Sequence, residues 1–133
     1  MSAEKVRQSM ENLGRALERL SEVLLEERTE FMIDATIQRF EFSIELFWKT
    51  LKRQLAFEGI EATTPRETIK HAYKNSWLRE ETLWIDMLDD RNRTSHIYSE
   101  EMANEIYDHI KEYYEELAHT YQFLAERYSD LLK

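Results

Sequence analysis

The residues best suited to chemistry gather in one segment, DDRNRTSHIY (residues 89–98), within an otherwise strongly acidic chain. Arg91, Arg93 and His96 fall within it, and Tyr98 follows the histidine by two positions. A guanidinium can hold a phosphate through paired hydrogen bonds, and an imidazole can exchange a proton near neutral pH. Attack of an RNA 2′-hydroxyl on its neighbouring phosphodiester needs a proton mover and a cation at the developing oxyanion. Arg91 and His96 meet that minimum without a metal ion.

The same segment also permits a purely structural role. His96 would then end a helix, where a cation is favoured by the helix dipole. Arg91 and Arg93 would form ion pairs with nearby aspartates: Asp86, Asp89 or Asp90. On a straight helix Arg91 lies about 140° around the axis from His96, so its stem would have to swing toward the imidazole. An arginine and a histidine five positions apart are therefore a weak pattern by themselves.

The position of a helix end decides whether His96 and Tyr98 can act together. Residues two apart lie on opposite faces of a helix but on the same side of an extended chain. Ser99, followed by Glu100 and Glu101, is typical of an N-cap with an acidic first turn. We therefore expect the preceding helix to end near His96, with both side chains facing one cleft. A symmetric dimer would supply two copies of this cleft.

Composition favours one all-helical domain over residues 1–133. The 133 residues are 42% hydrophobic and 34% charged, with one proline, two glycines and no cysteine. So few chain breakers favour long helices over a sandwich or barrel. The absence of cysteine excludes a disulfide framework and fits a cytoplasmic protein, and the N-terminus is unlike a signal peptide. A net charge of −9 repels nucleic acid, so a role on RNA requires a local basic pocket or a partner.

Apolar spacing predicts an antiparallel up-and-down bundle of three long and two shorter helices. The first long helix ends near residue 24, and the second, central helix runs from about Glu30 to Phe57. Gly59 should stop the second helix as its C′ residue. A capping box at Thr64 and Glu67 predicts a short helix over 65–75, and a helical apolar face follows over 77–88. The last long helix starts after Ser99 and continues to the C-terminus.

Three strings in this order resemble the nucleotidyltransferase substrate-binding protein family: RFEFSIELFWKTLK, TPRETIKHAYK and WIDMLDDRNRTSHIYSEEMANEI. That family belongs to the HEPN superfamily and includes the HepT toxins. The resemblance implies a dimeric helical bundle that is encoded beside a minimal, MntA-like nucleotidyltransferase as a toxin–antitoxin pair. It also implies a ribonuclease that needs neither a metal nor another cofactor. No apolar run approaches the roughly 18–20 residues of a membrane span, so we expect no association with a membrane.

The toxin motif is an arginine, four residues, a histidine, any residue and a tyrosine. It maps onto Arg91, His96 and Tyr98 without departure, and the polar residue after the arginine is Asn92. By resemblance, Arg91 and His96 would be catalytic, and Tyr98 would be the hydroxyl that the partner enzyme modifies with AMP. Asn92 and Arg93 would support the site.

Two other functions remain open at this point. The chain could be a non-catalytic subunit that presents a substrate to the nucleotidyltransferase, or a helical dimerisation module without a site. Other candidate residues have simpler explanations. Glu116 and His119 form a single ExxH, whereas a di-iron bundle needs two such motifs and two further glutamates. The remaining candidates are expected to be core residues (Trp48 and Trp84), surface histidines (His71 and His109) and a carboxylate-paired arginine (Arg39).

Overall fold

The computed structural model describes residues 2–97 and 99–132. Within them the chain forms six α-helices and a 3-10 turn, so the predicted all-α fold is confirmed. The elements are α1 (Ala3–Leu24), α2 (Glu30–Phe57), α3 (Pro65–Lys74), α4 (Glu81–Arg93), η1 (Thr94–His96), α5 (Glu100–Arg127) and α6 (Ser129–Leu132). The final helix was predicted as continuous, but the structure breaks it at Tyr128 and adds the short α6. Within the described residues, every helix is too short or too polar to cross a membrane.

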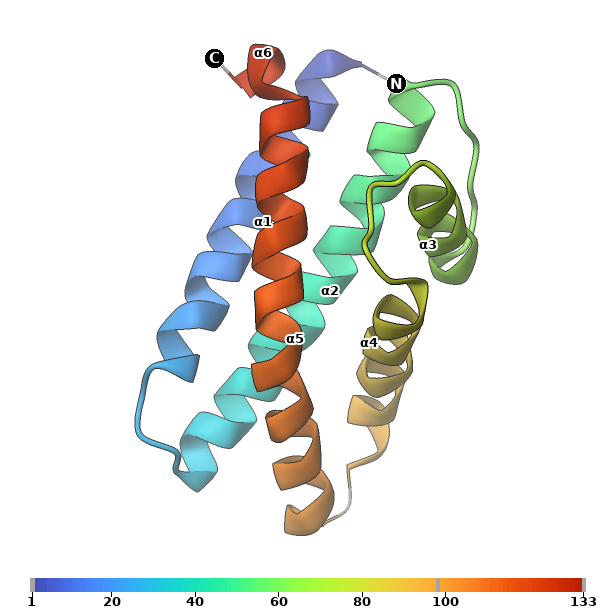
Figure 1. The fold of residues 1–133 in the computed structure, drawn as a ribbon. Coiled ribbons are helices and arrows are strands. Elements are labelled where there is room, and N and C mark those ends of the chain that lie inside the picture. Colours follow the sequence, from blue (N-terminus) through green and yellow to red (C-terminus); the bar gives the residue numbers. More distant parts are fainter. Residues whose placement is uncertain (1, 98, 133) are drawn as a thin grey trace.

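The long helices α1, α2 and α5 lie side by side, and α3 and α4 pack along one flank (Figure 1). Both termini lie at one end of the bundle, and the corner between α4 and α5 lies at the other end (Figure 1). The helix α2 contacts α1, α3, α4 and α5, which confirms its predicted central place. Its side chains Phe40, Phe47, Leu51 and Leu55 are fully buried. Each such burial stabilises the fold by about 1.5–3 kcal/mol, so α2 organises the core.

The C-terminus of α2 is closed by Gly59, as its sequence position predicts. The Gly59 amide donates to the carbonyl of Ala56 at 3.0 Å, and the Ile60 amide donates to that of Leu55 at 2.8 Å. This pair of bonds is a Schellman motif, which needs a left-handed residue after the cap. Gly59 supplies it with φ +85°, a conformation that glycine adopts without the steric cost of a Cβ.

The start of α3 has the two residues of the predicted capping box, with the return contact of Glu67 mainly to the residue before the cap. Thr64 caps the helix by accepting a bond from the Glu67 amide at 3.2 Å. The Glu67 carboxylate accepts mainly from the amide and the hydroxyl of Thr63, at 3.3 Å and 2.8 Å, and more weakly from the backbone of Thr64. These bonds lower the pKa of Glu67 below its usual 4.5, and they fix the connection that leads into α3.

The segment before α4 departs from the prediction. Trp77 and Leu78 were expected on a helical face, but the helix begins only at Glu81. Ser76 takes a left-handed conformation with φ 64°, and this turns the chain so that an irregular stretch follows α3. Both apolar side chains are still buried in the core. The sequence therefore identified the buried residues correctly and their secondary structure wrongly.

The corner between α4 and α5 bears out the local prediction. The helix α4 ends at Arg93, η1 continues to His96, and Ile97 is extended with φ −86° and ψ 112°. Ser99 is the N-cap of α5, since its hydroxyl accepts a bond from the Met102 amide at 3.1 Å. Tyr98 lies outside the described residues, so its predicted orientation beside His96 stays a prediction.

Candidate functional site

Arg91 lies in the last turn of α4, where it contacts the central helix. Its Nη2 atom is 3.0 Å from a carboxylate oxygen of Glu45 on α2. The other oxygen of Glu45 lies 3.4 Å from the ammonium of Lys49. The Nε atom of Arg91 is buried and has no hydrogen-bond partner among the described residues. The structural alternative, which paired Arg91 with a nearby aspartate, is wrong, because the end of α4 packs against α2 and Arg91 pairs with Glu45.

Arg93 does pair with a neighbouring aspartate, as the structural alternative predicted. One guanidinium nitrogen bonds to Asp90 at 3.1 Å, and the other lies 3.6 Å from Glu105 on α5. Since its side chain stays 39% exposed, Arg93 faces solvent as well as these carboxylates. It therefore lies at the surface of the corner, one turn before His96.

Within one chain, Arg91 and His96 line two neighbouring hollows. His96 is exposed on η1 and lines the first hollow together with Asn92, Arg93 and Met102. Arg91 lines a second hollow of about 470 Å³ between α2, α3 and α4. Asn92 lines both hollows. The predicted cleft shared by His96 and Tyr98 stays a prediction, because Tyr98 lies outside the described residues.

A third hollow, of about 670 Å³, lies between α1 and α2 and also includes Arg91 and Glu45. Its wall includes Phe42, whose 60% exposure is unusual for a phenylalanine. Arg39 also lines it and bonds to the carbonyl of Arg19 at 2.6 Å, with Glu22 3.5 Å away. The predicted carboxylate pairing of Arg39 is thereby confirmed. Arg91 and Glu45 thus line both this hollow and the second one.

A buried carboxylate next to Arg91 was not identified in the sequence. Asp90 is 4% exposed and accepts bonds from the Tyr113 hydroxyl at 2.5 Å and from Arg93. It also lies 2.9 Å from the Nδ1 atom of His109, which is half-buried and not the surface residue that we expected. Burial, followed by the bond to Asp90, raises the pKa of Tyr113 well above its usual 10.0. The cluster fixes the end of α4 against α5 and so positions the adjacent Arg91.

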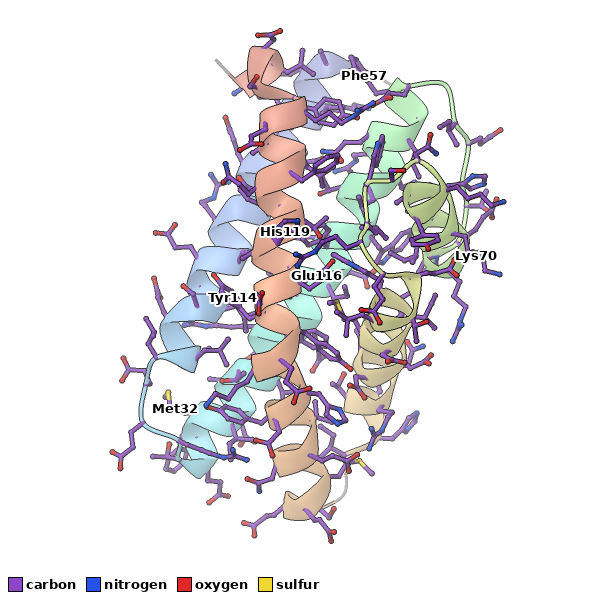
Figure 2. All side chains as sticks on the ribbon, viewed as in Figure 1. Met32, Phe57, Lys70, Tyr114, Glu116 and His119 are labelled. Carbon is purple, nitrogen blue, oxygen red and sulfur yellow. The ribbon has the colours of Figure 1, made fainter. Side chains whose placement is uncertain are left out.

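A second buried carboxylate, Glu116, occupies the position of the ExxH pattern. It and His119 lie near the middle of α5 (Figure 2). One oxygen of Glu116 accepts from Arg79 at 3.0 and 2.6 Å. The other accepts from the indole of Trp84 at 3.2 Å and from Thr120 at 3.3 Å. With both oxygens bonded, Glu116 joins α4 to α5 and has a structural role.

Comparisons with known proteins identify the family. The family model "Nucleotidyltransferase substrate binding protein like" matches residues 4–126. A Haemophilus influenzae protein named "Probable ribonuclease HepT" is 31% identical over 101 residues, which cover 72% of this chain and 69% of that protein. A crystal structure from Thermus thermophilus superposes with a TM-score of 0.79 at 35% identity, over 84% of this chain and 98% of that one. The chain therefore belongs to the nucleotidyltransferase substrate-binding protein family, and its sequence is HepT-like.

Proposed function

We propose that the protein is a HepT-like toxin, an RNA endonuclease that works without a metal ion. The observation that carries the proposal is the motif of Arg91, Asn92 and His96 at the α4–α5 corner, in a chain related to a probable ribonuclease. The two hollows that Asn92 lines offer an anion-binding group on one side and a proton-transfer group on the other. Such a pair suits an RNA strand that crosses the corner.

The reaction needs few groups. The neutral imidazole of His96 takes the proton of an RNA 2′-hydroxyl, and the 2′-oxygen attacks the adjacent phosphorus. The bond from phosphorus to the 5′-oxygen breaks, and the imidazolium returns the proton to that leaving oxygen. The products are a 2′,3′-cyclic phosphate and a 5′-hydroxyl. Arg91 stabilises the negative charge that grows on the phosphoryl oxygens, the usual role of a guanidinium at such a centre.

We infer that the active form is a homodimer. Phe31 and Phe42 are 77% and 60% exposed, and eleven positions on one helix place them on the same face of α2. Large apolar side chains on one exposed face are typical of an interaction surface. A second copy would cover them and bring a second Arg91 and His96 to the assembly. Analytical sedimentation tests this: the wild type should have the mass of a dimer and Phe42→Asp that of a monomer. Equal masses for the two proteins would reject this interface.

We propose further that a cognate MntA-like minimal nucleotidyltransferase inactivates the toxin by modifying Tyr98. The phenol oxygen would attack the α-phosphorus of ATP, forming a bond to AMP and releasing pyrophosphate. Tyr98 is two positions from His96, so AMP would add bulk and negative charge at the corner and repel an RNA phosphate. Mass spectrometry after incubation with the partner and ATP should show one or more AMP groups on Tyr98. An unmodified Tyr98 with an active partner would reject this regulation.

The nuclease is tested with purified protein in a metal chelator. Wild type should cleave single-stranded RNA and leave 2′,3′-cyclic phosphate ends, whereas His96→Ala and Arg91→Ala should lose at least about 100-fold in rate. His119→Ala is the matched control, since this histidine lies on α5 away from the corner. Equal cleavage by wild type and His96→Ala would indicate a contaminant and reject the proposal.

A second function is favoured by one observation, the ion pair between Arg91 and Glu45 in a chain of net charge −9. An arginine already neutralised by a carboxylate, in an acidic protein, suits a non-catalytic subunit that presents a substrate to the nucleotidyltransferase. Nucleotide binding by the complex of the two proteins, together with no RNA cleavage and no growth arrest on expression, would establish this alternative.

A further inference from the structure

Trp48 differs from the other two tryptophans of the chain. Trp77 and Trp84 are 4% and 0% exposed, and both belong to the core. Trp48 was expected in the core as well, but it is only partly buried. It lines the 470 Å³ hollow beside Arg91, which we call the Trp48 hollow. A partly exposed indole that lines the same hollow as a candidate phosphate-binding arginine is suited to contact a ligand there.

The Trp48 hollow combines apolar and polar groups in a way that suits a nucleotide. Trp48, Leu88 and Pro65 form its apolar part. Its polar lining includes four residues besides Glu45: Thr64, Arg66, Arg91 and Asn92. The volume falls within the range of small-ligand sites, about 300–1,000 Å³. An indole can stack on any base, and the two guanidiniums can bind the phosphates on either side of it.

The charged residues that line this hollow differ from those that line the hollow beside His109. The Trp48 hollow has two arginines and one carboxylate, Glu45, among its lining residues, and the arginines pair with Glu45 and with Asp89 outside the lining. The hollow beside His109 has four lining carboxylates against one arginine, Arg93. The Trp48 hollow is therefore the less acidic of the two, and an anionic strand is repelled less there. In a chain of net charge −9, this makes it the more favourable of the two places for RNA.

We propose that the Trp48 hollow is a subsite that stacks one unpaired base of the RNA substrate beside the scissile phosphate. The inference rests on the proposed nuclease and names the class of RNA that it takes. Asn92 lines both this hollow and that of His96, so a strand held at Trp48 would pass Asn92 on its way to the imidazole. A base can enter only when it is unstacked, so the substrate is single-stranded RNA or a loop.

The test measures binding separately from cleavage. A labelled single-stranded oligonucleotide with 2′-O-methyl riboses cannot be cleaved, and its fluorescence anisotropy reports affinity. Trp48→Leu should weaken binding about 5- to 150-fold, which corresponds to about 1–3 kcal/mol for one stacked base. Trp48→Phe should retain most of the affinity, because phenylalanine keeps a stacking face. Phe123→Leu is the matched control, since it removes an exposed aromatic ring from α5.

A second measurement on the wild type avoids any folding defect of the variants. The other two tryptophans are buried, so quenching of tryptophan fluorescence by the oligonucleotide should arise from Trp48 and vanish in Trp48→Phe. Equal affinity of wild type and Trp48→Leu, or equal affinity for duplex and single strand, would overturn the subsite. It would also be overturned if Trp48→Leu changed only the sedimenting mass, because the hollow would then be a self-association surface.

The outcomes for the subsite and for the nuclease are distinguishable. Oligonucleotide binding that depends on Trp48 in a protein that cleaves no RNA would retain the subsite and reject the nuclease. RNA cleavage by the wild type, combined with binding that ignores Trp48, would retain the nuclease and reject the subsite.

Discussion

Replacing Asp90 by alanine should destabilise the protein more than any change at an exposed acid of α4. The substitution leaves the buried Tyr113 hydroxyl without its acceptor, at a cost of about 1–3 kcal/mol. His109 and Arg93 also lose a partner, but they are 36% and 39% exposed, so water can replace it and each adds only about 0–1 kcal/mol. The expected total is about 1–5 kcal/mol, a large share of the roughly 5–15 kcal/mol that stabilise a domain.

Urea unfolding, followed by far-UV circular dichroism, measures this loss. The matched control is Asp89→Ala, because Asp89 is the adjacent residue and forms an exposed ion pair with Arg66 at 2.5 Å. Its removal should cost less than about 1 kcal/mol. Asp90→Asn should recover part of the loss, since the amide oxygen can still accept from Tyr113. The reasoning is refuted if Asp90→Ala loses no more stability than Asp89→Ala.

Three further predictions concern pH and backbone conformation. Because burial raises the pKa of Tyr113, wild type should lose stability as pH rises above about 10, and Tyr113→Phe should show a flatter alkaline limb in thermal melts. The guanidinium of Arg127 and the hydroxyl of Tyr128 lower the pKa of Glu58, so stability should fall below about pH 4.5, and less steeply in Glu58→Gln. Gly59→Ala should cost about 1–2 kcal/mol in urea unfolding, because alanine is strained at φ +85°; an unchanged midpoint would contradict the Schellman cap.

Helix positions were largely predictable, because the signals that set them are local. The apolar spacing and the Gly59 stop predicted a central helix over 30–57, and α2 spans Glu30–Phe57. The capping residues before Pro65 predicted a helix ending near Asn75, and α3 ends at Lys74. Two predictions missed. The start of α4 lies later than predicted because an irregular stretch follows the left-handed turn at Ser76, a conformation that serine rarely adopts, and the last helix breaks at Tyr128.

The partners of the candidate site residues were not predictable from spacing. Arg91 pairs with Glu45, 46 positions away, because the end of α4 packs against α2 at the level of Glu45. Asp90 meets His109 and Tyr113 because α5 returns past the end of α4. The apolar pattern predicts which face of each helix is buried, but it does not fix how far one helix slides along another. A hint existed in His109 and Tyr113, whose spacing of four places them on one face of α5.

The arginines around the Trp48 hollow and the α4–α5 corner already have carboxylate partners: Glu45 for Arg91, Asp89 for Arg66, and Asp90 for Arg93. A phosphate that binds there displaces a carboxylate, and the freed carboxylate takes up cations that the RNA releases, so few ions are released in total. A single phosphate group therefore gains little binding free energy. A strand that contacts several arginines and the indole at once gains binding free energy from each contact. Affinity for such a strand should depend on salt less steeply than is usual for proteins that bind RNA through unpaired cations.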